Sequence, residues 1–330
     1  MFTGTRMATA VVTAPPESRQ RKLGMFFRDG DQVTHLVTFL FAASVFLVTV
    51  FLVYELWIHS APSRAKFGFS FLTGKTWDPV AEQFGALPFI YGTVLTSFVA
   101  LLISVPLGVG AAIFLAELAP PKLSNLCTFL VELLAAVPSV ILGLLAIFTL
   151  VPIMRQYIEP FLKHTLGDLP LFQGPAYGVG YLTASLILAI MTFPFIISIS
   201  REALLAVPRE QREAALALGA TKWESTWQVV VPYARLGILG SIFLALARAL
   251  GETMAVTMVI GNDTGIHTSL LSPGYTIAAI IANEFTEATG DIYLSSLVEL
   301  GLVLFALTMV LNAAAQLLII ATTGKGSKQA

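Results

Sequence analysis

Cysteine is almost absent from the sequence, which limits the chemistry available to the chain. The single cysteine, Cys127, lies beside an apolar run. One thiol excludes an intramolecular disulfide, and this one is expected to be a small buried apolar side chain. The four histidines lack the spacing of metal ligands, and neither a nucleophile elbow nor a zinc signature occurs. The sequence therefore predicts no catalytic residue, no metal site, no cofactor and no enzymatic activity of its own.

Charged residues are also scarce. They make up 12% of the 330 residues, whereas hydrophobic residues make up 56%. Soluble domains contain about 25% charged and roughly 45–50% apolar residues, so this composition is that of an integral membrane protein. The 19 basic and 20 acidic residues nearly balance, which gives no reason to expect nucleic acid as a partner.

A nucleotide-binding loop is missing as well. Gly74-Lys75-Thr76 has the residues that end a P-loop, but the upstream Gly68 leaves five intervening residues where four are required. The chain therefore lacks a nucleotide-hydrolysing site of its own, and ATP hydrolysis must come from a partner.

Long apolar runs, in contrast, are abundant. Six of them reach the roughly 20 residues that a helix needs to cross the hydrocarbon. We expect an all-α, polytopic membrane protein with six transmembrane helices at residues 33–58, 89–118, 125–152, 179–200, 236–260 and 294–321. Pro106, Gly108 and Gly110 predict a kink or a close helix approach within the second segment.

The remaining residues complete the expected organisation. Residues 1–32 are a polar, basic cytoplasmic tail without a removable signal peptide, and residues 59–88 are an extracytoplasmic loop. Residues 89–321 form the transmembrane domain, which includes a cytoplasmic loop at 201–235, and residues 322–330 form a second cytoplasmic tail. In the last outer loop, residues 275–282 are apolar but too short to span, so they predict a re-entrant or surface-lying helix.

Basic residues predict the orientation, because lysine and arginine concentrate in cytoplasmic loops. With both termini inside, most of the 19 basic residues fall on the cytoplasmic side, including Arg209, Arg212 and Lys222. The loop at 201–235 is therefore expected to face the cytoplasm.

The polar stretch between the fourth and fifth segments predicts a short helical hairpin. Pro208 suits the first turn of a helix, and Gly219 follows about three turns later, where a C-terminal glycine belongs. Thr221 and Glu224 have the spacing of a capping box for a second helix, which Pro232 would end. The first helix is narrow and rich in alanine and leucine, a shape that fits a groove of another protein.

The hairpin also contains a spaced motif. Its members are Glu213, Ala214, Ala215, Gly219, Val229, Val231 and Pro232. Three residues separate Ala215 from Gly219, and nine separate Gly219 from Val229. This spacing resembles the EAA loop of ABC importer permeases, which has isoleucine and leucine at the positions of Val229 and Val231. The resemblance implies type I ABC importer permease architecture and a cytoplasmic loop that transmits the closure of a separate ATPase. The alternative is an ordinary amphipathic linker.

One arginine lies inside an apolar segment. Arg248 is at the middle of the expected 236–260 helix, about 18 Å from either end by helical rise and so near the bilayer midplane. An arginine there costs about 2.5–3.5 kcal/mol on insertion scales, so it should face the protein interior or a water-filled path. Glu252 lies one turn further on and can reach it, while Gly251 and Ala255 keep the adjacent surface small.

Two interpretations of Arg248 and Glu252 stay open. They form a buried ion pair that locks helix packing, or they form an anion site in which the guanidinium matches a tetrahedral oxyanion. The carboxylate would accept a hydrogen bond only from a solute that still carries a proton, as hydrogen phosphate does at neutral pH and sulfate does not. Glu117, Glu132 and Glu299 either line the path or hydrogen-bond between helices, and the second role is favoured.

Four separate motifs carry a further resemblance. They are Arg-Ala-Leu-Gly-Glu-Thr-Met-Ala-Val at 248–256, the stretch from Pro106 to Glu117, Pro138-Ser139-Val140 and Ala282-Asn283-Glu284. With them, residues 85–321 resemble the phosphate ABC importer permease (PstC) family. The resemblance implies import of inorganic phosphate across the bacterial cytoplasmic (inner) membrane, with Arg248 and Glu252 as the family's intramembrane pair.

The same resemblance implies the partners. They are a second permease subunit (PstA-like), an ATPase dimer (PstB-like) and an extracytoplasmic phosphate-binding protein (PstS-like), within a lipid bilayer. Rival interpretations are a permease of the same architecture for sulfate or molybdate, and a proton-coupled secondary transporter that uses Arg248 and Glu252 as a relay. A membrane-embedded enzyme lacks a catalytic constellation, and a constitutive channel has no support in the sequence.

Overall fold

The computed structural model describes residues 30–323, and side chains within residues 34–317. The predicted tails at 1–32 and 322–330 fall mostly outside this range. The chain divides into two units, residues 1–55 and residues 56–330. The described part of the first unit belongs to one helix, α2 (Gly30–His59), whose apolar side chains run all round it as in a membrane-spanning helix.

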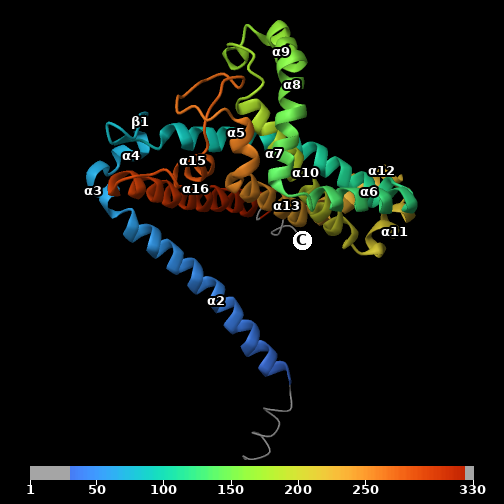
Figure 1. The fold of residues 1–330 in the computed structure, drawn as a ribbon. Helices are drawn as coiled ribbons and strands as arrows, with labels where there is room; N and C mark the ends of the chain where they lie inside the picture. The colour runs from blue at the N-terminus through green and yellow to red at the C-terminus, as the bar shows by residue number, and fades with distance from the viewer. Residues whose placement is uncertain (1–29, 324–330) are drawn as a thin grey trace, which may run out of the picture. The chain divides into compact units, whose positions relative to one another are not determined.

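The second unit consists mainly of helices (Figure 1). In chain order its elements are α3 (Ala61–Phe67), α4 (Ser70–Thr73), β1 (Trp77–Asp78), β2 (Gln83–Phe84), α5 (Leu87–Ile113), η1 (Phe114–Leu118), α6 (Pro121–Ala135), α7 (Ser139–Leu145), η2 (Ala146–Leu150), α8 (Val151–Ile153), η3 (Met154–Ile158), α9 (Glu159–Leu166), η4 (Pro170–Phe172), α10 (Tyr181–Leu205), α11 (Arg209–Ala217), α12 (Lys222–Ser225), η5 (Thr226–Val230), α13 (Val231–Gly251), α14 (Met254–Val259), α15 (Ile277–Glu284) and α16 (Asp291–Thr323). The strands β1 and β2 pair antiparallel and are a minor exception to the all-α class.

Six helical stretches within residues 34–317 are long and apolar enough to cross a membrane. They are Thr34–His59, Leu87–Leu118, Ser139–Leu166, Tyr181–Leu205, Lys222–Gly251 and Asp291–Leu317. The predicted all-α class with six membrane helices is confirmed. The first, second, fourth and sixth segments lie close to their predicted bounds, whereas the third and fifth are displaced.

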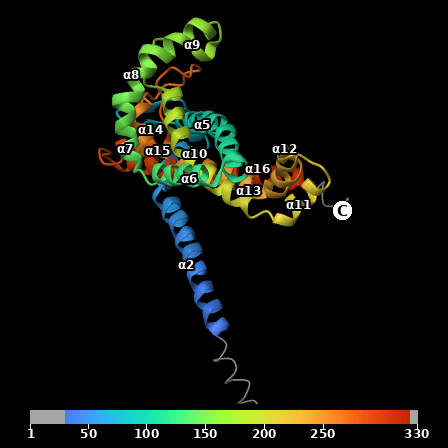
Figure 2. The same cartoon turned by 90° about the vertical axis from the view of Figure 1, so that its right-hand side faces the viewer.

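The third predicted segment is wrong in its bounds. Instead of one helix at 125–152, α6 ends at Ala135, and a new helical stretch runs from Ser139 through α7, η2, α8 and η3 to the end of α9 (Figure 2). The break falls at Val137-Pro138, because proline lacks an N–H group and disfavours the helical conformation in the residue before it. Residues 153–166, which follow the predicted end of the third segment, are therefore helical as well.

Prolines also explain the π-helical turns η1, η2, η3 and η5. Each turn is followed two residues later by a proline, namely Pro120, Pro152, Pro160 or Pro232. In each, the residue before the proline donates its N–H to the carbonyl five positions earlier, as Val231 does to Thr226. In η2, η3 and η5 this wider turn lets the helix continue past the proline. The prediction that Pro232 ends the second helix of the hairpin is therefore wrong.

α10 is the central helix of the second unit. It packs against α5 and α13, and α13 also packs against α16. Hydroxyl groups join these helices: Thr192 Oγ1 donates to Ser104 Oγ at 3.0 Å, and the Oγ atoms of Ser200 and Ser241 are 2.8 Å apart. Small hydroxyl residues let membrane helices approach closely and hydrogen-bond across the interface.

An aromatic cluster closes one end of this unit. The ring centroids of Trp77 and Phe84 are 4.7 Å apart, and Tyr293 stacks on Phe84 at 5.3 Å. Glu284 ties the cluster to α15, because its Oε2 accepts hydrogen bonds from Trp77 Nε1 at 2.8 Å and from Tyr293 Oη at 2.6 Å. The short helix predicted at 275–282 is confirmed as α15, and it packs inside the unit against α5 and α16.

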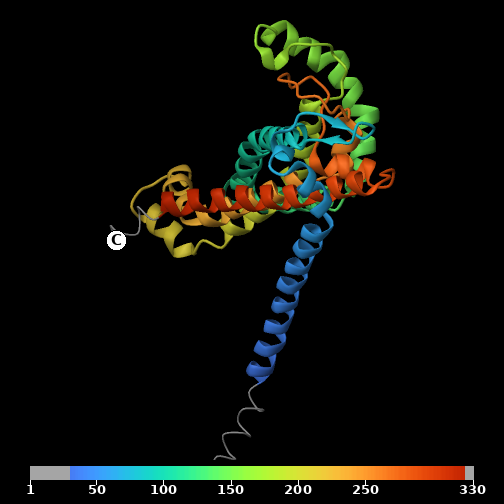
Figure 3. The same cartoon turned by 90° about the vertical axis from the view of Figure 1, so that its left-hand side faces the viewer.

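The polar hairpin lies at the opposite end. Figures 1 and 3 show α11 and α12 at one end of α10, α13 and α16, and α3, α4 and β1 at the other. The segment that contains α3, α4 and β1 and the polar hairpin therefore lie at opposite ends of these helices. Which side is cytoplasmic stays a prediction from the basic residues.

Gly92 of α5 provides a test of this packing. A Cβ atom at Gly92 would lie 2.0 Å from the carbonyl oxygen of Tyr275, whereas one at Gly110 in the same helix would meet nothing within 4 Å. We expect Gly92→Ala to destabilise the protein by about 1–3 kcal/mol through overpacking. Gly110→Ala should leave stability unchanged or raise it by up to about 1 kcal/mol. Thermal unfolding monitored by size-exclusion chromatography measures both, and equal Tm values would contradict the described packing.

Candidate functional site

The first helix of the hairpin, α11 (Arg209–Ala217), forms where the sequence predicted it. Gly219 follows the helix with φ +91°. Its N–H bonds to the carbonyl of Leu216, and the N–H of Ala220 bonds to that of Ala215, which together make a Schellman motif. A Cβ at Gly219 would meet nothing within 4 Å, so glycine is favoured there by the backbone conformation alone.

The second helix of the hairpin begins with the predicted capping box. Thr221 Oγ1 accepts a hydrogen bond from the N–H of Glu224 at 3.3 Å, and the Glu224 carboxylate accepts one from the N–H of Thr221 at 2.8 Å. Trp223 and Trp227 follow with ring centroids 5.5 Å apart, and both are exposed. From Lys222 the chain stays helical through η5 and α13 to Gly251.

α11 presents an exposed, partly apolar surface. Leu218 is 90% exposed, Glu213 and Ala214 are exposed, and Ala215 is buried. The surface borders a cavity of about 570 Å³ lined by Gln211, Ala214, Ala215, Leu218, Gly219, Ala220, Glu224, Gln228 and Val229. The structure thus brings Ala214, Ala215, Gly219 and Val229 of the EAA-like motif together at one hollow, while Glu213, Val231 and Pro232 lie outside its lining.

Arg212 fixes α11 to the ends of two membrane helices. Its Nε and Nη2 atoms lie 3.2 and 2.9 Å from Oε1 of Glu117 in η1. Nη2 also donates to the carbonyl oxygen of Leu204 at 2.7 Å, and Nη1 donates to that of Val207. The side chains of Arg212 and Glu117 are 20% and 13% exposed, so solvent screens their attraction little. Glu117 therefore hydrogen-bonds between elements, the role that the sequence favoured.

Behind this contact lies a small apolar core that the ends of three membrane helices share. Its buried residues are Ala112, Ile113, Leu204, Val207, Val230, Ala234 and Ile238. A displacement of α11 would act on α5, α10 and α13 through Arg212 and this core.

Sequence reasoning missed Arg212 as a functional residue. In the sequence, Arg212 stood out only as one of the basic residues that predict the membrane orientation, because Glu117 is 95 positions away. An acidic residue at the end of an apolar segment and an arginine beside the Glu213 motif were the available signals. Only the fold shows that they pair.

Arg248 lies near the end of its helix and not at the middle. The helix begins at Lys222 and ends at Gly251, so the expected continuous helix at 236–260 is wrong. The observed bounds do not place Arg248 at the bilayer midplane. The chain becomes extended at Glu252, with φ −70° and ψ 128°, and α14 begins at Met254. Glycine and threonine both have low helix propensity, which explains a break at Gly251-Glu252-Thr253.

The expected contact between Arg248 and Glu252 is not among the ion pairs of the described residues. Contact between side chains one turn apart requires a continuous helix, and the chain leaves the helix at Glu252. The guanidinium carbon of Arg248 instead lies 4.4 Å from the ring centroid of Phe195 in α10. Nε of Arg248 is buried without a hydrogen-bond partner, while Glu252 accepts only a 3.5 Å contact from the N–H of Ala255.

The surface beside Arg248 is open on one side only. A Cβ at Gly251 would meet nothing within 4 Å, whereas the Cα of Ala255 would lie 3.0 Å from a Cβ at Gly143 of α7. Gly251 is exposed and Ala255 is buried. The space at Gly251 is therefore free, whereas Ala255 packs closely against α7. Phe195 was missed because nothing in the sequence distinguishes it among 23 phenylalanines.

One helix connects the two candidate sites. From Lys222 at the hairpin to Arg248 the helix rises about 39 Å. Glu132 and Glu299 lie on other helices: Glu132 is exposed on α6, and Glu299 is buried in α16.

Comparison with known proteins identifies relatives of nearly full length. A family model described as the binding-protein-dependent transport system inner membrane component matches residues 104–320. The chain is 49% identical over 293 residues to the phosphate transport system permease protein PstC of Mesorhizobium japonicum, covering 88% of this chain and 90% of that protein. It is 48% identical to the protein of the same name from Pasteurella multocida, covering 84% and 88% of the two chains.

A solved structure is also similar. A chain of a bacterial ABC transporter involved in the import of the acidic polysaccharide alginate matches with a TM-score of 0.57 and 15% identity, covering 88% of this chain and 98% of that one. At this identity the likeness is one of fold.

Removing the Arg212 side chain tests the contact between α11 and the membrane helices. We expect Arg212→Ala to increase hydrogen–deuterium exchange of residues 209–217 about tenfold or more, because hydrogen bonds to a charged group contribute roughly 1.5–3 kcal/mol each. Arg209→Ala removes the same charge from an exposed position of the same helix and serves as the control. Equal exchange in the two variants would show that Arg212 does not hold α11.

Proposed function

The chain belongs to the family of binding-protein-dependent transport system inner membrane components, and from this premise we propose that it is a permease subunit of an ATP-driven importer of inorganic phosphate. It is a multi-pass inner-membrane protein with the fold of ABC importer permeases. Two relatives that it matches over most of their length carry the name of a phosphate permease, which supports the substrate.

The unpaired guanidinium of Arg248 carries the proposal for the transport site. A buried N–H without a partner is costly, and a guanidinium without a carboxylate leaves its charge uncompensated. An oxyanion that approaches past the open side at Gly251 would supply both the acceptor and the charge. Arginine presents planar N–H groups that match tetrahedral oxyanions, and the ring of Phe195 would hold the guanidinium plane in place.

Glu252 would favour phosphate over sulfate. Its carboxylate is half-buried, and its one hydrogen bond within the described residues is the long contact with Ala255. A carboxylate close to a bound anion repels it unless the anion brings a proton that the carboxylate can accept. Hydrogen phosphate has such a proton at neutral pH and sulfate does not. A site of this kind binds weakly, which allows release.

Coupling would start at α11. In the proposed complex a dimeric, PstB-like ATPase docks on the surface formed by Glu213, Ala214, Leu218 and Gly219, which faces the cytoplasm together with both termini. Closure of the ATPases would move α11, and Arg212 with the apolar core behind it would carry the displacement to α5, α10 and α13. A PstA-like permease would complete the path, and a PstS-like binding protein would deliver phosphate at the opposite face.

Replacement of Arg248 tests the site. We expect Arg248→Gln to lower uptake of radiolabelled phosphate about 100-fold or more, because two charge-assisted hydrogen bonds are lost. Copurification with the ATPase should persist. Arg235→Gln on the same helix is the matched control and should transport normally.

Normal uptake by Arg248→Gln in cells without other phosphate transporters would remove the site assignment. An excess of sulfate or molybdate should leave uptake unchanged. Equal competition by these anions would overturn the phosphate assignment and leave the anion site in place.

A further inference from the structure

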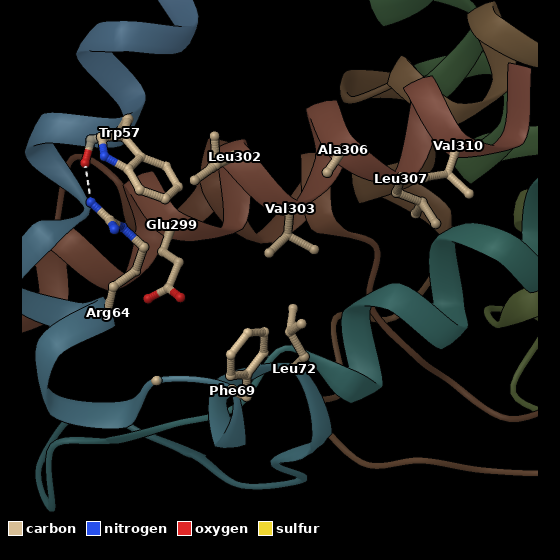
Figure 4. A pocket seen from close by; sticks show the side chains of 11 residues that line it. Trp57, Arg64, Phe69, Leu72, Glu299, Leu302, Val303, Ala306, Leu307 and Val310 are labelled. Carbon is tan, nitrogen blue, oxygen red and sulfur yellow. Dashed lines mark hydrogen bonds between the residues drawn. The ribbon is translucent and has the colours of Figure 1, made fainter. Parts of the chain in front are cut away.

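A second hollow is lined by none of the residues assigned to transport above. This cavity, of about 590 Å³, is bounded by α16 and by the stretch from Trp57 to Leu72 (Figure 4). Leu302, Val303, Ala306, Leu307 and Val310 line it from α16, and Phe69 and Leu72 line it from the facing segment. Phe69 is 90% and Val310 63% exposed, so the hollow is open along its apolar part.

Two charged side chains, Arg64 and Glu299, lie at one end of this cavity. Glu299 is 5% exposed, and its Oε2 has no hydrogen-bond partner. Arg64 Nε donates to Ser60 Oγ at 3.0 Å, Nη2 donates to the carbonyl oxygen of Trp57, and the guanidinium carbon lies 3.7 Å from the Trp57 ring centroid. These contacts hold the guanidinium in place near Glu299.

Arg64 and Glu299 are not paired with each other among the described ion pairs. The cavity therefore presents one fixed positive group and one fixed, buried acceptor side by side. The unsatisfied Oε2 requires an N–H or O–H donor, because a buried carboxylate oxygen without one is costly. A ligand that carries an anionic group and a cationic N–H group on a short spacer satisfies both ends.

The apolar part of the cavity has the length of one membrane leaflet. From Glu299 to Val310 the helix rises about 16 Å, close to half of the roughly 30 Å hydrocarbon core. Trp57 lies at the end of the candidate span Thr34–His59, in the position of an aromatic residue at the membrane–water interface. An apolar groove of this length with a charged end matches one acyl chain beneath a lipid headgroup.

We propose that this cavity binds an aminophospholipid of the phosphatidylethanolamine type. Its phosphate would contact Arg64, its ammonium N–H would donate to Glu299 Oε2, and one acyl chain would lie along Val303 and Leu307. Phosphatidylcholine has no N–H to donate, and phosphatidylglycerol can donate an O–H but has no cation to offset the charge of the Glu299 carboxylate. The site does not depend on which anion the chain transports.

Lipid retention tests the proposal. The full-length chain, with the subunits that copurify with it, is reconstituted in nanodiscs of equal parts phosphatidylethanolamine, phosphatidylcholine and phosphatidylglycerol with identical acyl chains. Native mass spectrometry then counts the retained lipids. Wild type should retain phosphatidylethanolamine about tenfold over phosphatidylcholine, the effect of one charge-assisted hydrogen bond. Glu299→Gln should lose this preference, and Arg64→Gln should retain less of all three lipids.

The controls separate the site from general effects of charge. Asp291→Asn on α16 and Lys66→Gln on α3 remove the same charges from residues outside the cavity lining, and both should behave as wild type. Ala306→Trp fills the groove without touching the charged end and should also reduce retention of phosphatidylethanolamine.

Three results would overturn the proposal. The first is equal retention of phosphatidylethanolamine and phosphatidylcholine by wild type, and the second is an unchanged preference in Glu299→Gln. The third is a crosslink from a photoreactive residue at position 69 to another polypeptide, which would show that protein covers the groove. A crosslink to phosphatidylethanolamine supports the site.

Discussion

The hydrogen bonds of one arginine, Arg212, hold the exposed end of the molecule in place. α11 has nine residues, which is too short for a helix to be stable by itself in water. Because Ala215 is its only buried residue among those described, its position depends on the contacts of Arg212 with Glu117, Leu204 and Val207. Arg212 therefore holds α11 on the membrane helices, while Leu218, directly after α11, stays exposed to a partner.

The continuous helix from Lys222 to Gly251 connects the second half of the hairpin to Arg248. The π turn η5 keeps Pro232 inside the helix, so the second helix of the hairpin and Arg248 belong to one continuous helix. The helix then stops at Glu252, and this break separates the carboxylate from the arginine that it would otherwise neutralise. In the proposed importer, the rigid helix carries motion from the ATPase, and the break leaves a positive charge for the anion.

Local signals in the sequence predicted much of this fold. Apolar length identified the six membrane helices, and Gly219 and the Thr221–Glu224 spacing identified the hairpin, because helix ends depend on neighbouring residues. Two predictions at prolines were wrong. Pro138 divides the expected third helix, and Pro232 does not end its helix, because a π turn that the sequence spacing does not reveal accommodates it. The pairing of Arg212 with Glu117 and the contact of Arg248 with Phe195 depend on how distant helices pack, so no local pattern could predict them.

The proposed mechanism requires that energy enters through a partner ATPase and not through this chain. Arg248 and Glu252, as placed here, do not form the directly bonded relay that a proton-coupled carrier would use. The most direct test is phosphate accumulation by the purified complex in proteoliposomes, with and without ATP and a protonophore. Accumulation should require ATP hydrolysis and should be unaffected by the protonophore. Accumulation that persists without ATP and stops when the proton gradient is dissipated would contradict ATP-driven transport.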